Sequence, residues 1–565
     1  MNAGILLVLL ALGAIAISAF GRRVNAQPGL LILVAAAGVS FVPGLPRLEL
    51  DPELILGLVV PPLLYAAALE FSFFSFMRNL RAILGLGVVL VLLTAWLSRV
   101  AVDLMLPTLG AGIALLLASI VAPPDTVTIT AHGEEIGLTK RVTALLTGES
   151  LVNDAMALTL FSIALATTGG EETFIDNGAL LFFWSAIVGV LIGFALGNLA
   201  TLIRRRLDDP TLGTAIGLVV PFAAYLAAEE AHASGVLAVV VAGFNVAVES
   251  EFGNRRRQRL GFRTRMTERE VWPVLGALLE SFVFAYTGLQ MKFIIDDLRE
   301  SGEPLGKTLL TGIVLLFVVI AVRFLWVALI FGRRLLANQS LQRRLQDPLF
   351  RKRWDDRMQE LTERRGRAPE VPEALGWKEQ VLLSWTGMRG IVTLGAAGGI
   401  PLLTEEGAPF PHRDTLQFLA YFVVFGTLLL QAPTLPLLAR WLTIDTSDED
   451  RIALEQLARA EQIATDARAG KMPEIPEENQ PGRDRPGARN GAADRGRADR
   501  PRRRARSGRL VRGEAKAAAD PAALDEYDRQ REALSISVIG RQVDDEAAQV
   551  VLNRIDRQQA AAETL

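Results

Sequence analysis

Long apolar runs, separated by short polar segments, recur along the chain as far as residue 442. Runs of about 18–25 residues have the length that an α-helix needs to cross about 30 Å of hydrocarbon. The pattern predicts thirteen spans: residues 3–20, 28–46, 53–76, 82–104, 109–131, 141–167, 179–203, 211–229, 233–249, 273–295, 308–331, 378–403 and 415–441. The first run resembles a signal peptide, but it lacks a basic start and a small-residue cleavage site, which favours a transmembrane helix. We therefore expect an all-α polytopic membrane protein.

The loops between these spans alternate in charge. Basic loops include "GRRVNAQ", "RRRLDD" and the long segment 332–377, whereas "GGEETFIDN", "IDDLRESGEP" and "LLTEEGAPFP" are acidic or neutral. Because basic loops stay in the cytoplasm, we expect the N-terminus outside and the C-terminal tail inside. This orientation agrees with an odd number of spans in the plasma membrane.

The composition changes after Leu442 and divides the chain into a membrane domain, 1–442, and a cytoplasmic tail, 443–565. Residues 481–509 are rich in Pro, Gly and Arg, so we interpret them as a disordered basic linker; contact with anionic lipid is the alternative. Residues 524–559 have apolar positions at helical spacing. They predict an amphipathic helical segment that packs on itself or on a partner.

Composition excludes several classes of protein. The 565 residues are 51% hydrophobic, and the formal net charge of −2 gives no basic surface that would indicate a nucleic-acid partner. The chain has no cysteine and three histidines, which excludes disulfides, thiol catalysis and a multi-histidine metal site. No nucleophile–base set or phosphate loop is evident, so we expect neither an enzyme nor a bound cofactor.

Within the sixth span, "TGESLVND" places four polar residues where a helix would cross the membrane. Glu149 and Asn153 are four residues apart, as are Ser150 and Asp154, so all four share one helical face. Carboxylate, hydroxyl and amide oxygens suit a hard monovalent cation such as Na⁺, or a proton. The alternative is a hydrogen-bonded cluster that only joins helices.

The fifth span contains "SIVAPPDTVTITAH", with Asp125 directly after two prolines. Prolines remove backbone donors and disfavour helix before them, so a broken helix is expected. Broken helices in transporters expose carbonyls that coordinate ions near the midplane. The alternative is a simple proline kink with Asp125 directed toward one end.

In the twelfth span, "LLSWTGMRGIVTLGAAGGIP" combines five glycines with Arg389. A permanent charge there must be neutralised, and Glu149 or Asp154 are candidate partners. The guanidinium could instead substitute for a cation in the empty site, or anchor the helix at the cytoplasmic edge.

Other acids in or near spans give a weaker signal. Glu70 ends "PPLLYAAALE", Glu229 lies in "AYLAAEEAHASGV", and Glu280 lies in "LGALLESFVFAYTG". Each is a possible ion ligand, and for each a charge at the span boundary is at least as good an interpretation.

Taken in order, these motifs resemble the monovalent cation:proton antiporter-1 family, the NhaP/NHE-type sodium–proton exchangers of bacterial type with a cytoplasmic tail. The likeness covers residues 3–442 and rests on "PPLLYAAAL", "TGESLVNDAMAL", "PFAAYLAAEEAHASGVLAVVVAG", "FVFAYTGLQM" and "GMRGIVTLGAA". It implies two inverted six-helix repeats, core and dimerisation domains, and two discontinuous helices that cross at the ion site, around Asp125 and Gly387–Gly399. It also implies a homodimer whose core domain moves like an elevator.

The resemblance assigns roles to individual residues. Asp154 and Asp125 are the cation/proton carboxylates, Ser150 is a side-chain ligand, and Glu149 and Asn153 organise the site. Arg389 is the arginine that ties Glu149 into the core.

Two positions depart from the family pattern. The family usually has Thr-Asp-Pro where this chain has Pro124-Asp125-Thr126. The backbone carbonyl of Pro124 is then the candidate ligand beside the aspartate. An acid that is common in the family is replaced by Ala66, and Glu70, one turn further on, is a candidate to supply that carboxylate.

These expectations describe an antiporter that exchanges Na⁺, or Li⁺, for H⁺ and contributes to pH and sodium homeostasis. Cation and proton compete for Asp154 and Asp125, and Asn at position 153 favours electroneutral one-for-one exchange. A K⁺/H⁺ antiporter with the same machinery is the alternative within transport. A cation channel or a membrane sensor is the alternative from another class.

Overall fold

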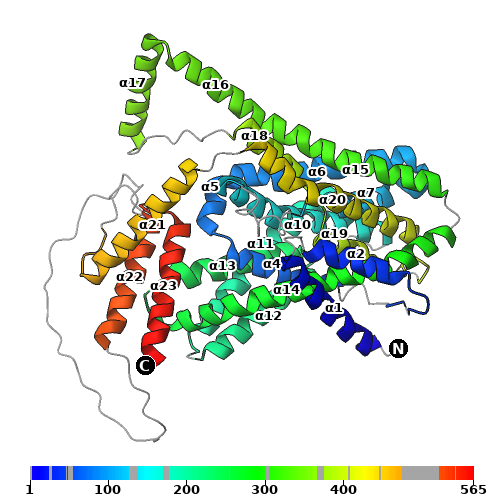
Figure 1. The fold of residues 1–565 in the computed structure, drawn as a ribbon, viewed down its shortest axis with the longest axis horizontal. Coiled ribbons are helices and arrows are strands. Elements are labelled where there is room, and N and C mark those ends of the chain that lie inside the picture. Colours follow the sequence, from blue (N-terminus) through cyan, green and yellow to red (C-terminus); the bar gives the residue numbers. More distant parts are fainter. Residues whose placement is uncertain are drawn as a thin grey trace, which may run out of the picture. The chain divides into compact units, whose positions relative to one another are not determined.

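The computed structural model describes residues 3–23, 28–45, 47–48, 55–125, 138–169, 177–207, 209–252, 255–300, 304–365, 375–404, 407–443, 447–473, 521–540 and 542–564. Regular structure in these ranges is helical, with two isolated β-bridges. The predicted all-α class is therefore confirmed for the described residues (Figure 1). By its internal contacts the chain forms two compact units, a membrane unit up to Ile452 and a C-terminal unit beyond it that also takes in the start of α14, up to Arg259.

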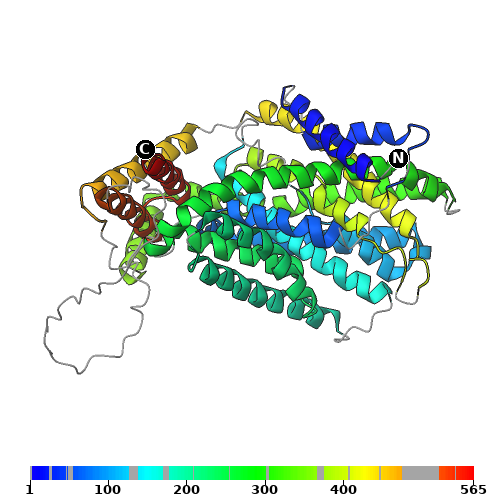
Figure 2. The ribbon, with the colours of Figure 1, turned by 90° about the horizontal axis from the view of Figure 1, so that it is seen from below.

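Helices of the first half of the membrane unit lie alongside one another in both views (Figure 1 and Figure 2). They are α1 (Ala3–Arg23), α2 (Pro28–Ser40), η1 (Ile55–Val59) with α4 (Val60–Glu70), α5 (Phe73–Leu84) with η2 (Gly85–Val89) and α6 (Leu90–Met105), η3 (Pro107–Leu109) with α7 (Gly110–Val121), α10 (Lys140–Gly169), α11 (Gly178–Arg204), α12 (Pro210–Glu229) and α13 (Gly235–Phe252).

The second half begins with two long helices. It comprises α14 (Arg255–Glu300), α15 (Leu305–Val327) with η4 (Ala328–Gly332) and α16 (Arg333–Leu345), α17 (Pro348–Arg365), α18 (Trp377–Trp385), α19 (Ile391–Gly398) and α20 (Arg413–Leu442).

Seven helices in the described part of the chain are long and apolar enough to cross a membrane, and five more apolar helices are shorter. The multi-pass character is therefore supported, whereas the count of thirteen spans and the inverted repeats stay predictions.

The boundary between the third and fourth spans differs from the prediction. The helix breaks at Phe71 and Ser72, and "MRNLR", expected in a loop, lies inside α5. Ser72 explains the break, because its hydroxyl accepts a hydrogen bond from the Ser75 N–H at 3.0 Å and so caps the start of α5.

Glycines allow α11 to pack closely on α13. A Cβ at Gly193 would collide with the backbone carbonyl of Ala238, and one at Gly189 would lie 2.8 Å from that of Ser234. Small residues four positions apart let two helix backbones approach where no water drives them together. This packing brings the start of α13 against α10, where Thr159 Oγ1 and Ser234 Oγ are 2.8 Å apart.

The C-terminal unit contains most of α21 (Ser447–Arg468), together with α22 (Pro521–Ile539) and α23 (Asp545–Thr564). Helices α22 and α23 cover the segment 524–559 that the sequence predicts to be helical and amphipathic. Arg531 is fully buried between them and donates to Asp556 Oδ1 at 2.8 Å and Gln559 Oε1 at 2.6 Å. The predicted linker, 481–509, lies outside the described residues.

Candidate ion-binding site

The polar face of α10 is buried in the membrane unit. Glu149 and Asn153 have no exposed surface, and Ser150 and Asp154 are 4% and 5% exposed. Their spacing along one helix brings all four together, as the sequence predicts.

The helix before this face ends just before the two prolines. Helix α7 ends at Val121, and Pro123 and Pro124 lie outside any helix. The Pro124 carbonyl therefore has no partner within a helix, and it accepts a hydrogen bond from Asn153 Nδ2 at 2.7 Å. Asn153 thus fixes the carbonyl that the sequence marks as a candidate ligand.

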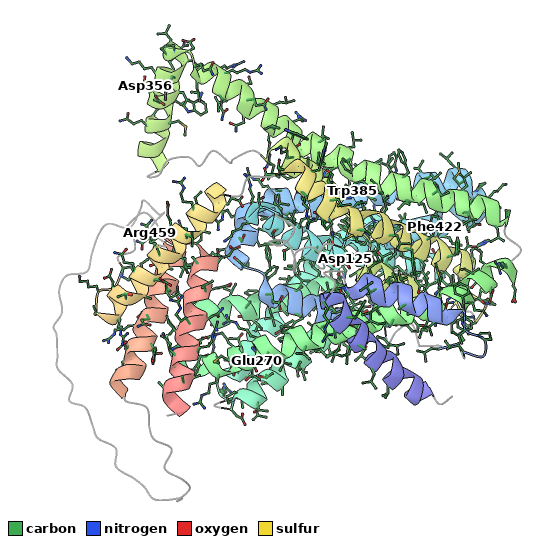
Figure 3. All side chains as sticks on the ribbon, viewed as in Figure 1. Asp125, Glu270, Asp356, Trp385, Phe422 and Arg459 are labelled. Carbon is green, nitrogen blue, oxygen red and sulfur yellow. The ribbon has the colours of Figure 1, made fainter. Side chains whose placement is uncertain are left out.

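A second interruption separates α18 from α19 and meets the first. The Asp125 N–H donates to the Met388 carbonyl at 2.5 Å, which pairs the two extended segments antiparallel. Asp125 Oδ2 accepts from the Ile391 N–H at 3.0 Å, so this carboxylate lies at the N-terminus of α19, where the helix dipole favours negative charge. Figure 3 marks Asp125 among the helices of the membrane unit.

Gly390 makes this contact possible. A Cβ at this position would collide with the Asp125 carboxylate, so any side chain would displace it. The glycine-rich segment of the twelfth span therefore has a specific steric role beside Asp125.

The partner of Glu149 differs from the prediction. Arg323 of α15, rather than Arg389, holds Glu149 with both of its terminal nitrogens, one of them 3.0 Å from Glu149 Oε2. The two side chains are 2% and 0% exposed. Gly387 leaves space for Arg323, because a Cβ there would overlap the arginine side chain.

Arg323 was missed in the sequence, although a signal was present. It is a lone charge inside the apolar run 308–331, and a charge in such a place requires a buried partner.

Arg389 instead neutralises the ends of the interrupted helices. Its guanidinium donates to the carbonyls of Val121 at 3.0 Å and Ala122 at 3.3 Å, at the end of α7, and to Gly387 at 2.5 Å, just after α18. A cation at helix C-termini satisfies carbonyls that lack intrahelical donors. The prediction of a charged partner for Arg389 was therefore wrong, and backbone dipoles take that place.

Three oxygens of the α10 face remain without a hydrogen-bond donor from the described part of the chain: Ser150 Oγ, Asn153 Oδ1 and Asp154 Oδ1. They come from adjacent turns of one helix and are a hydroxyl, an amide and a carboxylate oxygen. Asp125 and Glu149 are the carboxylates that interact electrostatically with Asp154. Buried oxygens in a negative field are what a hard cation or a proton would bind.

The described residues contain no cluster of three or more His, Cys, Asp or Glu side chains that could hold a metal ion.

The remaining candidates lie elsewhere. Glu70 is exposed at the last residue of α4, so it does not join the buried group. Glu280 is half-buried on α14. Thr126 lies outside the described residues.

A cavity of about 220 Å³ lies beside α10. Leu158 and Thr159 line it from α10, and Glu229 and His232 line it from the turn between α12 and α13. Leu158 follows Asp154 by one helical turn, so the cavity approaches the polar face from the C-terminal half of α10.

Comparisons with known proteins identify the family that the sequence matches. The sequence model of one family, described as "Sodium/hydrogen exchanger, transmembrane", matches residues 5–441. An uncharacterized Na⁺/H⁺ exchanger of Mycobacterium tuberculosis is 28% identical over 471 residues, which cover 82% of this chain and 79% of the relative. A sodium, potassium, lithium and rubidium/H⁺ antiporter of Bacillus subtilis is 30% identical over 443 residues, covering 77% of this chain and 61% of the relative.

The fold is also found among solved structures. The sodium proton antiporter MjNhaP1 of Methanocaldococcus jannaschii superposes with a TM-score of 0.56 at 16% identity, covering 78% of this chain and 99% of that one.

Proposed function

Because this chain belongs to the sodium/hydrogen exchanger family, we propose that it is a secondary antiporter that exchanges one Na⁺ for one H⁺ across the plasma membrane. The observation that carries the proposal is the group of three buried oxygens on α10, Ser150 Oγ, Asn153 Oδ1 and Asp154 Oδ1, which accept no hydrogen bond within the described part of the chain. The transported cation and the proton are substrates, and no resident cofactor takes part.

The exchange follows from competition for one buried carboxylate. A desolvated carboxylate without a partner is costly, so Asp154 binds either a proton or a cation. A cation would take its ligands from Asp154, Ser150 and Asn153, with Asp125 as the second charge. If the site crosses the membrane only when loaded, each cation that moves one way is matched by a proton that moves the other way.

The charges around the site support one-for-one exchange. Among the described residues, three carboxylates near the site, on Asp125, Glu149 and Asp154, are accompanied by two buried guanidinium groups, on Arg323 and Arg389. One negative charge therefore remains, which one proton or one monovalent cation neutralises.

Access to the site would alternate by an elevator-like movement of the core helices in a homodimer. The cavity beside α10 is the proposed external half of the route, since the acidic loops place the C-terminal end of α10 outside. In this orientation the N-terminus is outside and the tail is cytoplasmic.

Potassium is the second candidate cation. The Bacillus subtilis relative carries sodium, potassium, lithium and rubidium in its name. The replacement of the usual Thr-Asp-Pro by Pro124-Asp125-Thr126 changes the ligands beside Asp125, and so is a reason to test K⁺ in parallel.

The proposal is tested by reconstituting the protein in liposomes with an imposed proton gradient and adding Na⁺, Li⁺ or K⁺. Added Na⁺ should dissipate the gradient in wild-type vesicles, and Asp154→Asn should abolish this response because its amide cannot exchange a proton for a cation. Glu70→Gln is the matched control, an exposed carboxylate on α4 whose loss should leave exchange intact. Exchange at the wild-type rate by Asp154→Asn would refute the proposal.

A further inference from the structure

Helix α10, which carries the candidate ion site, donates a hydrogen bond at its cytoplasmic end to a residue 309 positions away. The N–H of Lys140, the first residue of α10, donates to Glu449 Oε2 at 2.7 Å. Glu449 lies in the first turn of α21, after the last membrane helix. The first N–H groups of a helix have no internal acceptor, and negative charge is favourable there, so Glu449 completes the start of α10.

Further hydrogen bonds near Lys140 connect α10 to α18 and α18 to α20. Thr139 Oγ1 donates to Glu379 Oε1 at 3.0 Å, and Glu379 Oε2 caps α18 by accepting from the Gly376 N–H at 2.6 Å. Lys378 Nζ donates to the Thr443 carbonyl, just after α20, at 3.3 Å. Hydrogen bonds thus connect the cytoplasmic ends of α10, α18 and α20. The hydrogen bond from Lys140 to Glu449 adds the start of α21 to this group.

Within the C-terminal unit, α21 is held by the hairpin of α22 and α23. Arg468 pairs with Glu526 of α22 at 2.5 Å, and Glu461 pairs with Arg554 of α23 at 2.6 Å. Helix α21 therefore begins, at Glu449, with a contact inside the membrane unit, and its later residues pack within the C-terminal unit; Arg459 marks α21 in Figure 3.

We propose that Glu449 is a positioning residue for the ion site, through which the start of α21 sets the position of α10. The proposal rests on the proposed antiport function. Glu149 and Asp154 follow Lys140 by nine and fourteen residues, or about 14 and 21 Å along the helix. Because a helix is stiff along its axis, a shift at Lys140 changes the spacing of the site oxygens relative to Asp125, and so the affinity for the cation.

The charges around Glu449 make this contact sensitive to cytoplasmic pH. Partial burial is the largest effect and raises the pKa of Glu449. The hydrogen bond from the Lys140 N–H lowers this pKa, the nearby Glu379 carboxylate raises it, and the positive charges of Arg141 and Lys140 lower it. As pH falls, Glu449 is protonated earlier than an exposed glutamate, and the negative charge at the start of α10 is lost.

The experiment measures Na⁺-dependent exchange in liposomes with the full-length chain. Glu449→Ala should raise the apparent KM for Na⁺ about two- to fivefold while the maximal rate changes little. Glu449→Gln keeps an acceptor oxygen and should lie closer to wild type. Glu455→Ala, on an exposed position of the same helix, should behave as wild type.

Two variants of Lys140 distinguish the effect of losing its backbone N–H from the effect of losing its side chain. Lys140→Pro removes the donor N–H at a helix position that tolerates proline, whereas Lys140→Ala keeps it. Lys140→Pro should reproduce the KM of Glu449→Ala, and Lys140→Ala should not.

Unchanged KM in Glu449→Ala, or equal effects of the two Lys140 variants, would overturn the inference while leaving the antiport function intact. Loss of exchange in the wild-type vesicles would instead refute the proposed function, and this inference with it.

Discussion

At the scale of single residues, Arg323 and Arg389 are almost completely buried among the membrane helices. Arg323 neutralises a carboxylate, Glu149, and also donates from Nε to the Leu383 carbonyl at 3.1 Å. Arg389 neutralises the carbonyl ends of α7 and α18. With Glu149 paired in this way, Asp154 is the carboxylate to which the proposed function assigns the transported ions.

The Arg323–Glu149 pair yields a prediction about stability. Arg323→Met should lower the free energy of unfolding by about 3–5 kcal/mol, because it leaves Glu149 charged and buried without a partner. Adding Glu149→Leu should recover much of that loss, since a buried pair replaced by apolar groups is close to neutral. Thermal unfolding of the detergent-solubilised protein measures both, with Arg334→Met, an exposed arginine of α16, as the control. A single variant as stable as wild type would contradict the assigned pairing.

Residue-scale prediction from sequence named residues that the structure brings together, but it did not give all of their pairings. "TGESLVND" on one helical face and Asp125 after two prolines are local patterns, and the structure brings them together through Asn153 and Pro124. Which arginine reaches Glu149 depends on how α10, α15 and α18 pack, and no local pattern contains that information. Arg323 and Arg389 are both isolated charges in apolar runs, so the sequence offers two candidates for one carboxylate.

At the scale of elements, the site is made by the places where helices stop. Helices α7, α18 and α19 end or begin around the bridge between Asp125 and Met388. Sequence predicts these helix ends because proline removes a backbone N–H donor and glycine permits backbone conformations outside the helix. The break at Ser72 was missed, since a serine cap inside an apolar run is a weaker signal than a proline.

The crossing yields a prediction about one glycine. Gly390→Ala should abolish exchange, because the added methyl group would occupy the position of the Asp125 carboxylate. Gly395→Ala is the matched control on α19: its Cβ would meet no atom closer than 3.5 Å, and alanine favours a helix. Exchange rates in liposomes compare the two. Equal activity of both variants would show that the close approach of Asp125 to Gly390 is unimportant.

At the scale of the whole molecule, charge is segregated between the two units. In the described part of the membrane unit, the buried charges of Arg323, Glu149 and Arg389 are paired or capping groups, and the C-terminal unit folds around Arg531, Asp556 and Gln559. Composition predicts this division, because a change from apolar runs to charged segments marks the end of the membrane helices. The contact from Glu449 to Lys140 spans 309 positions and could not be predicted from sequence.

The central claim is that one buried carboxylate binds either a cation or a proton. The most direct test measures the apparent KM for Na⁺ over a series of pH values in liposomes with equal pH on both sides, using tracer Na⁺ exchange. Competition predicts that the KM rises as pH falls, approaching about tenfold per pH unit once the site is mostly protonated, while the maximal rate stays constant. A KM that does not change with pH, or a maximal rate that falls at constant KM, would contradict a shared site.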